Sequence, residues 1–297
     1  MHEMLNHCPV CAGMKFSLFM TVRDHFLSRE EFDIVQCEKC GFRFVNPRPL
    51  PEEIARYYQS EEYRSHDAQR GDLLSRIYRS ARFFSIRFKY GIVRRYAKPG
   101  KILDLGCGTG EFLLFCRRNG YEVTGVEPND TASAFARDIN KIPVYQNFAE
   151  VNDEKGAFSC ITMWHVLEHV HDLNGTLETI RKLLSPDGTL IVALPNCNSW
   201  DAAKYGEFWA AYDVPRHLYH FTAASLRTLM QKHFFEVRAM LPQRLDSFYI
   251  TLLSRKYRTG SSSYLLALAQ GFWSNLQAGM NNRGYSSQVF ILTPKNP

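Results

Sequence analysis

The pattern of apolar and polar positions changes twice along the chain. Between residues 16 and 36 apolar residues alternate with polar ones in strand fashion. Between 72 and 97 apolar residues recur at helical spacing, which predicts a long amphipathic helix. From Ile102 the chain reads as a short buried strand, a glycine-rich turn and a new helix, the expected beginning of an α/β fold.

Residues 102–112 read ILDLGCGTGEF and form the most informative stretch. The glycines of this turn let a ligand approach the backbone, and the helix that follows offers free N–H groups. Glu111 stands where a dinucleotide fingerprint needs its third glycine, and no Gly-Lys-Ser/Thr of a P-loop follows. Glu127 ends the next predicted strand, Tyr121 to Val126, where a carboxylate can accept hydrogen bonds from ribose hydroxyls.

With these motifs the chain resembles the class I S-adenosylmethionine-dependent methyltransferases. The resemblance covers residues 98–297, with the third strand at 143–146, the fourth strand and its helix at 158–172 and the fifth strand at 188–196. It places the closing strand pair at 234–242 and 287–294. It therefore implies a Rossmann-like domain with a seven-stranded mixed sheet.

The resemblance also implies which residues bind the cofactor. Asp104 would order the glycine turn, and Glu127 would bind the ribose. Asn147 and Phe148 lie where the family contacts adenine, although the family often has an acid there. Core packing is the alternative for Phe148 and Met163. The full predicted set is Asp104, Gly106, Cys107, Gly108, Glu127, Pro128, Asn147, Phe148, Met163 and His165.

Two C-x-x-C pairs near the N-terminus supply four thiolates, which match a closed tetrahedral zinc site. With the alternating segment between them they outline a zinc ribbon over residues 1–50, too small to hold a core without the metal. The predicted ligands are Cys8, Cys11, Cys37 and Cys40. We expect the other four cysteines to be small buried side chains.

Composition fits a soluble globular protein, with 45% hydrophobic residues and a net charge of +6. No apolar run approaches the length of a membrane span, and the N-terminus lacks the apolar core of a signal peptide. These features predict a cytoplasmic location.

Residues 46–51, Asn-Pro-Arg-Pro-Leu-Pro, predict a rigid extended linker after the ribbon. Residues 51–97 then form a linker and helices whose later part is strongly basic. We expect this long helix to cover the sheet and expose a solvated basic face, although Gly91 could break it. The alternatives are an anionic substrate, such as a nucleotide-linked sugar, or a membrane or RNA surface. The basic residues are Arg70, Arg76, Arg79, Arg82, Arg87, Lys89, Arg94, Arg95 and Lys98, against Asp72 alone.

Residues 198–222 follow the fifth strand and are dense in aromatic side chains, with a few polar groups among them. Such a segment predicts the wall or lid of a substrate pocket, and Thr222 caps the next helix, 223–233. The resemblance extends to C-methyltransferases, in which a histidine just before such a cap can act as general base. His220 matches that place, and His217 is the alternative.

Two further segments leave alternatives open. His165, His169 and His171 surround Glu168 and suggest a metal, but the resemblance explains Leu167–Val170 more simply as the start of a helix that braces the neighbouring loop. The apolar insertion at 244–283 would roof the pocket or form an oligomer contact.

The ribbon, the N-P-R-P segment and the tyrosine-rich helix after it narrow the resemblance to small-molecule methyltransferases, with the zinc-ribbon C-methyltransferases of deoxysugar synthesis nearest. We therefore predict a methyltransferase that acts on a sugar, glycan precursor or secondary metabolite. The alternative is an RNA-modifying methyltransferase that grips nucleic acid with the ribbon and the basic helix. The ribbon shows neither a strong basic excess nor an aromatic-basic recognition pattern, which disfavours nucleic acid.

Overall fold

The computed structural model describes residues 1–58, 73–152, 154–261, 263–280 and 284–295 of the chain. Side chains are described from residue 82 onward within the first long helix. Arg70 and Asp72 of the predicted basic segment, and the side chains of Arg76 and Arg79, therefore lie outside the described part. No helix in the described part combines the length and hydropathy of a membrane span.

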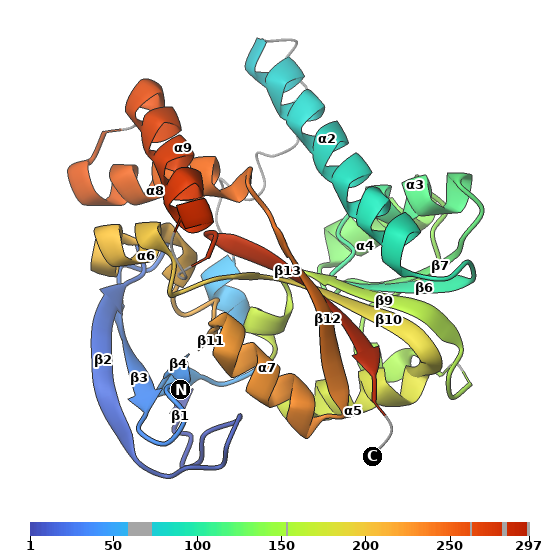
Figure 1. The fold of residues 1–297 in the computed structure, drawn as a ribbon, viewed down its shortest axis with the longest axis horizontal. Coiled ribbons are helices and arrows are strands. Elements are labelled where there is room, and N and C mark those ends of the chain that lie inside the picture. Colours follow the sequence, from blue (N-terminus) through green and yellow to red (C-terminus); the bar gives the residue numbers. More distant parts are fainter. Residues whose placement is uncertain (59–72, 153, 262, 281–283, 296–297) are drawn as a thin grey trace.

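A seven-stranded sheet forms the centre of the molecule, in the order β12-β13-β10-β9-β6-β7-β8 (Figure 1). The inner strands pair in parallel, whereas β13 is antiparallel to both of its neighbours. This confirms the predicted mixed sheet. The strands are β6 (Lys101–Leu105), β7 (Glu122–Val126), β8 (Val144–Tyr145), β9 (Phe158–Trp164), β10 (Leu184–Pro195), β12 (Phe235–Pro242) and β13 (Ser287–Pro294).

Helices cover both faces of this sheet because its strands carry apolar side chains on both sides. One face packs against α2 (Leu73–Tyr96), α3 (Glu111–Arg118) and α4 (Asp130–Asp138). The other packs against α5 (Leu173–Leu183) and α7 (Ala223–Lys232), whose N-cap is Thr222 as predicted. Helix α2 runs without interruption past Gly91, because a single glycine weakens a packed helix without ending it.

The N-terminal 50 residues form a small second sheet. The predicted alternating segment is the hairpin of β2 (Phe16–Arg23) and β3 (Glu31–Cys37), followed by β4 (Arg43–Val45). The fourth strand, β11 (Tyr219–His220), comes from the predicted lid and pairs with β4. Cys8, Phe42 and Phe44 belong to the same apolar cluster as strand residues of the large sheet. The ribbon and the large domain therefore share a core.

Residues 46–51, predicted as a rigid extended linker after the ribbon, are instead paired with its first residues. Arg48 and Pro49 are strand β5, which pairs with β1 (His2–Glu3), and the side chain of Arg48 is buried. The Arg48 guanidinium donates hydrogen bonds to the Tyr219 hydroxyl and to the His171 carbonyl. The prolines gave the extended conformation, but the polar side chains between them tie this segment to the large domain. The one-turn helix η1 (Ile54–Tyr58) follows.

Between β10 and β11 the chain forms α6 (Trp200–Tyr205) and the short helices η4 (Gly206–Phe208) and η5 (Ala210–Tyr212). The insertion forms two helices, α8 (Asp246–Thr259) and α9 (Tyr264–Met280), which pack on each other and on α6. In Figure 1 this pair and α2 stand at the same edge of the sheet, apart from each other.

Candidate functional site

The glycine turn lies at the carboxyl ends of β6 and β7, as predicted. Asp104 is buried at the end of β6 and accepts a hydrogen bond from Thr162 Oγ1 at 2.6 Å. Burial raises the pKa of Asp104 to about 7, and the nearby Lys89 opposes this rise. Gly108 has a φ of 54°, and a Cβ added there would meet nothing within 4 Å. The turn therefore leaves open space at Gly108, whereas a Cβ at Gly106 would meet Val166 at 2.5 Å.

Glu127 lies beside this turn with its carboxylate already fixed. Oε2 accepts a hydrogen bond from Gly108 N at 2.8 Å, and Oε1 accepts one from Asn129 N at 2.9 Å. Each carboxylate oxygen has further lone pairs, and the side chain is partly exposed. Glu127 can therefore accept hydroxyl hydrogens from a ligand lying over the glycine turn.

The other predicted cofactor residues occupy different environments. Gly106 adopts a φ of 70°, and Cys107 packs in the core against Gly125. Pro128 and Asn147 are exposed, and the Asn147 side chain caps the short helix η2 (Phe148–Glu150). Phe148 is half-buried against the core, and Met163 is completely buried. Core packing thus accounts for Met163 in this structure.

His165 lies at the end of β9 in a left-handed conformation, with a φ of 58°. Its Nε2 lies 3.0 Å from Asp246 Oδ2, and its Nδ1 lies 3.4 Å from Glu168 Oε1. Although burial opposes its charge, hydrogen bonding to the two carboxylates raises the pKa of His165 to about 10. The insertion thus contributes Asp246 to this edge of the sheet, which sequence reasoning did not foresee.

Sequence reasoning also missed Lys89. We expected it on a solvated basic face, but its ammonium group lies 5.1 Å from the centre of the Trp164 ring, and the side chain is half-buried. Burial lowers the pKa of Lys89, while Asp104 and Asp246 act in the opposite direction. Arg82 is also engaged, because its Nε lies 2.5 Å from Glu111 Oε2 at the start of α3. The position of a basic residue along the helix does not by itself show whether its side chain is buried.

The lid places its histidines differently. His220 is buried within β11, against the Tyr212 ring, and its Nε2 has no hydrogen-bond partner among the described residues. Burial lowers the pKa of His220 well below its ordinary value, so the ring is neutral. His217 lies against His169, with ring centres 4.6 Å apart. Leu167–His169 is a single 3-10 turn, and α5 begins after the Asp172 cap instead of at this turn.

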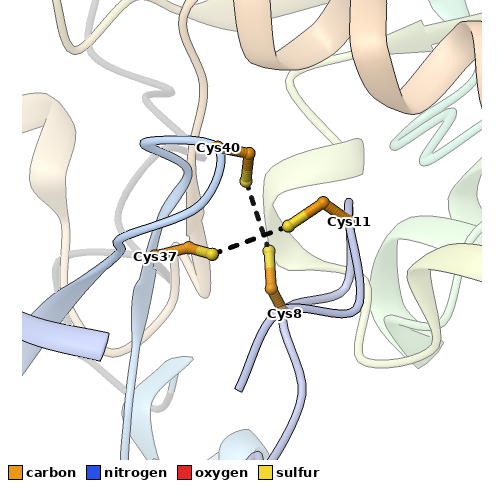
Figure 2. A group of neighbouring side chains, drawn as sticks. All are labelled: Cys8, Cys11, Cys37 and Cys40. Carbon is orange, nitrogen blue, oxygen red and sulfur yellow. Dashed lines mark hydrogen bonds between the residues drawn. The ribbon is translucent and has the colours of Figure 1, made fainter. Parts of the chain in front are cut away.

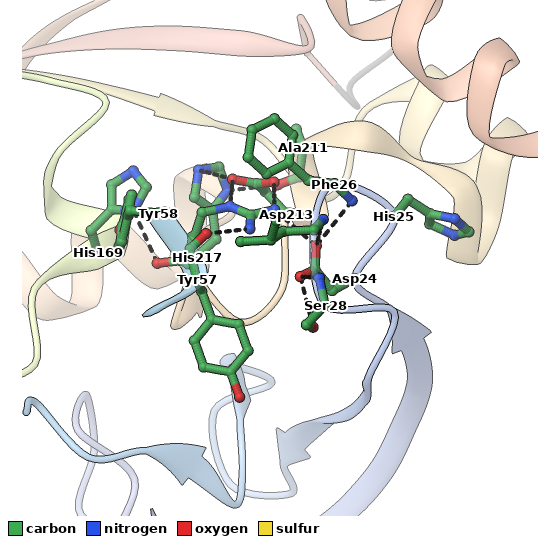
Figure 3. A network of polar contacts seen from close by, with 12 residues as sticks. Asp24, His25, Phe26, Ser28, Tyr57, Tyr58, His169, Ala211, Asp213 and His217 are labelled. Carbon is green, nitrogen blue, oxygen red and sulfur yellow. Dashed lines mark hydrogen bonds and ion pairs between the residues drawn. The ribbon is translucent and has the colours of Figure 1, made fainter. Parts of the chain in front are cut away.

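An ion-pair network fastens this part of the lid to the ribbon (Figure 3). Arg216 Nη2 lies 3.1 Å from Asp24 Oδ1 and 2.6 Å from Asp213 Oδ1. Burial opposes the charge of Asp24, but the guanidinium holds the pKa of its carboxyl below the ordinary value. Because Asp24 and Arg216 are almost completely buried, the pair is part of the folded core.

The four predicted metal-ligand cysteines converge (Figure 2). Cys8 Sγ lies 3.6 Å from Cys40 Sγ, and Cys11 Sγ lies 3.6 Å from Cys37 Sγ. Sulfurs of a tetrahedral zinc site with bonds of about 2.3 Å are separated by about 3.8 Å. Disulfide-bonded sulfurs would be about 2.05 Å apart, so the cysteines are free. The cluster fits one zinc ion. The remaining four cysteines are buried, as predicted.

Comparison with known proteins relates the chain to methyltransferases. A family model described as a methyltransferase domain matches residues 79–239. The ubiquinone biosynthesis O-methyltransferase of Rhodopseudomonas palustris is 25% identical over 162 residues, which cover 52% of this chain and 64% of that protein. The corresponding protein of Erwinia tasmaniensis is 33% identical over 125 residues, covering 39% of this chain and 51% of its own length. The chain thus matches less than two thirds of either relative.

Two solved structures share the fold. The [4+2]-cyclase SpnF aligns with a TM-score of 0.50 and 17% identity over 71% of this chain and 81% of its own. The complex of the Haloferax volcanii Trm112 methyltransferase activator with a putative methyltransferase aligns with a TM-score of 0.50 and 14% identity, over 70% of this chain and 89% of that chain. The family match spans more than half of the chain and includes the glycine turn, Glu127 and the whole lid; the chain belongs to the methyltransferase-domain family.

Proposed function

We propose that the protein transfers a methyl group from S-adenosylmethionine to a small molecule. The observation that carries this proposal is the Glu127 carboxylate, held by two backbone N–H groups beside an open glycine turn. This arrangement suits a ribose with two free hydroxyls. The family match and the methyltransferase relatives support the same activity.

The residues around the turn would hold and orient the cofactor. Glu127 would accept the ribose hydroxyls, and Asn147 and Phe148 would lie along the adenine. Lys89 would lie beside the carboxylate of the methionine end, and Asp104 beside its amino group, because their charges are complementary. When bound, S-adenosylmethionine supplies a methyl group that its sulfonium already activates. The chain then needs to align the acceptor with that methyl group and exclude water.

His220 is our proposed proton acceptor, with His217 as the alternative. Its Nε2 is unpaired among the described residues, so its lone pair is free to take a proton, whereas burial lowers the pKa of the ring and opposes that step until a bound acceptor or a neighbouring carboxylate offsets it. The proton of the acceptor's hydroxyl or acidic C–H would move to this nitrogen as the acceptor atom attacks the methyl group. The aromatic side chains of the lid would enclose the acceptor.

For the acceptor we propose a sugar, glycan precursor or secondary metabolite. The ribbon-containing architecture and the polar groups in an aromatic lid support a hydroxylated molecule. Lys89 supports a cofactor end with negative charge, whereas Arg82 is already paired with Glu111. The names of the matched relatives, ubiquinone biosynthesis O-methyltransferases, also point to small-molecule chemistry.

We further propose that the four cysteines hold a structural zinc ion. Four thiolates complete a tetrahedral site and leave no position for water. Cys8 and Cys37 are buried in the core that the ribbon shares with the large domain, which supports a structural role.

The activity is tested by incubating the chain with S-adenosylmethionine and a panel of hydroxylated metabolites while measuring S-adenosylhomocysteine release. Release that depends on one class of acceptor supports the proposal. Tight RNA binding that weakens steeply with salt, together with methylated RNA, would instead favour the nucleic-acid alternative.

The proposed base is tested by His220→Ala. We expect turnover to fall by roughly 10²–10⁴-fold with little change in cofactor affinity, because proton transfer is lost but the cofactor residues remain. His233→Ala, at the end of α7 and hydrogen-bonded to Asn174, is the control. Near wild-type turnover of His220→Ala at saturating acceptor would exclude His220 as the base.

A further inference from the structure

Glu168, His169 and His217 bring three potential metal ligands together where the 3-10 turn after β9 meets the lid. One ligand atom from each lies within 4.8 Å of the other two. The Leu218 N–H donates to the Glu168 carbonyl at 2.8 Å, which holds the two segments together. Within the part of the chain that the structure describes, only the four cysteines form another such group.

The Glu168 carboxylate lacks the partners that its burial requires. Its side chain is 1% exposed, and neither oxygen has a hydrogen-bond partner among the described residues. His165 Nδ1 lies 3.4 Å from Oε1, but the same ring lies closer to Asp246 through its other nitrogen. The Glu168 carboxylate therefore has one long ion pair, to His165, and no closer donor among the described residues, which is little for a buried charge. A cation bound at Oε2 would add the partner that this oxygen lacks.

The two imidazoles are held in the orientation that metal ligands use. Nδ1 of His169 lies 2.9 Å from the Arg216 carbonyl oxygen, and Nδ1 of His217 lies 2.9 Å from that of Ala211 (Figure 3). Because a carbonyl oxygen only accepts, Nδ1 carries the proton in both rings and Nε2 keeps its lone pair. Metal-binding histidines are usually fixed by such a bond from the nitrogen that does not touch the metal. The Tyr58 hydroxyl lies 2.9 Å from the same His169 nitrogen.

We propose that Glu168, His169 and His217 bind a divalent first-row transition-metal ion that in turn binds oxygen atoms of the methyl acceptor. Two imidazoles and one carboxylate suit such an ion and leave coordination positions open for other ligands. The Asp213 carboxylate, 3.9 Å from His217 Nε2, adds negative charge beside the cluster. The acceptor role of this site rests on the proposed methyl transfer.

This arrangement separates the two lid histidines. His217 becomes a metal ligand, and His220 remains the proton acceptor. His165 lies 3.4 Å from the Glu168 carboxylate and also at the predicted methionine end of the cofactor, so an acceptor bound to the metal would lie near the methyl donor. An acceptor with two adjacent oxygens, such as a vicinal diol, would suit the open positions.

The test is a titration with Mn²⁺ of the full chain, whose cysteine site is first loaded with zinc. The electron paramagnetic resonance signal of free Mn²⁺ measures how much of the ion is bound. Mn²⁺ prefers oxygen and imidazole ligands to thiolates, so it distinguishes this site from the cysteines. We expect one Mn²⁺ per chain. The affinity for Mn²⁺ should be at least about tenfold weaker in Glu168→Gln and in His217→Gln, because losing a metal ligand should cost at least as much as losing a residue that only orients a ligand. The control is His171→Gln, whose Nε2 contacts the Pro49 carbonyl.

Absence of a stoichiometric Mn²⁺ site in the wild-type chain overturns the proposal, whether or not the variants fold. Unchanged Mn²⁺ affinity in both folded variants overturns it as well. Cofactor affinity measured by calorimetry in the same samples separates this result from the proposed function. If the chain binds cofactor and transfers methyl groups equally well without Mn²⁺, the proposed function stands and the role of the metal site is excluded.

Discussion

At the scale of single residues, the Glu127 assignment gives the most direct test of cofactor binding. Glu127→Ala should weaken S-adenosylmethionine binding by about 1–3 kcal/mol, because hydrogen bonds to a charged acceptor are lost. The fold should persist, since the side chain lies partly exposed at the end of β7. The matched control is Glu122→Ala at the opposite end of the same strand, where the carboxylate is 3.7 Å from Lys101. Equal calorimetric affinities of the two variants would remove Glu127 from the ribose site.

The buried ion pair of Asp24 and Arg216 should make stability depend on pH. The pKa of Asp24 is lowered on folding, so its contribution is fully present above the unfolded value of about 3.9. It should disappear as the pH falls through the still lower folded pKa. Asp213 shares Arg216 and shifts in the same direction, so the two carboxylates act together.

We therefore expect Asp24→Asn to lower the free energy of unfolding at pH 7 by less than the about 3–5 kcal/mol of a fully unpaired buried charge, because the Arg216 guanidinium loses Asp24 but keeps Asp213. The difference from wild type should shrink in acid. Urea denaturation at a series of pH values measures both effects. The partly exposed Asp33, which accepts a hydrogen bond from Thr21, provides Asp33→Asn as a control. A difference that stays constant from pH 7 to acid would contradict the ionic interpretation.

Residue roles were predictable from sequence where a local motif required them. The glycine turn follows β6, and Glu127 follows the neighbouring strand β7. Their proximity is therefore expected from their spacing in the sequence. Lys89, Asp246 and the pairing of Glu168 with His217 depend on contacts between distant segments. The spacing of residues in the chain does not indicate which side of a helix faces the carboxyl ends of the strands. The prediction of a solvated basic face therefore missed Lys89.

At the scale of elements, the strands of the central sheet were predictable, β6 from its own apolar run before the glycine turn and most of the others from the order of segments in the family that the chain resembles. The exceptions are informative. Residues 46–51 resembled a linker because prolines usually end structure, yet Arg48 makes this segment part of the folded ribbon. Strand β11 has only two residues, too few for an alternating pattern to identify it.

The insertion offers an element-scale prediction. A Cβ at Gly271 would meet the Phe248 ring at 2.6 Å and its Cα at 2.9 Å, so α8 and α9 pack closely there. Gly271→Ala should force the helices apart and destabilise the protein by about 1–3 kcal/mol. Gly279→Ala on the same helix is the control, since its new Cβ would meet only the Tyr285 hydroxyl at 3.9 Å. Thermal unfolding compares them; equal midpoints for both variants would mean that the helix contact is not tight.

At the scale of the whole molecule, the ribbon is built into the methyltransferase unit. It supplies strands to the sheet that holds β11, and Arg48 and Asp24 bond to residues of the large domain or its lid. Apolar residues of the ribbon and of β9 and β10 belong to one cluster. The ribbon looked separate from the large domain because its motifs are contiguous, whereas its partners lie far along the chain, as in the hydrogen bonds of Arg43 with Cys197 and of Arg48 with Tyr219.

Removal of zinc should therefore disturb the lid as well as the ribbon. Without the metal, four buried or half-buried thiols would remain and the hairpin β2–β3 would lose the cross-link at its base. Because β4 pairs with both β3 and β11, amide protection at 219–220 should fall together with that of 31–45. Strands β6 and β7 have no pairing with the ribbon, so their protection should change little. Hydrogen exchange before and after chelation measures all three regions. Loss of protection confined to residues 1–45, with 219–220 unchanged, would show that the ribbon unfolds without the lid and that zinc does not support the site.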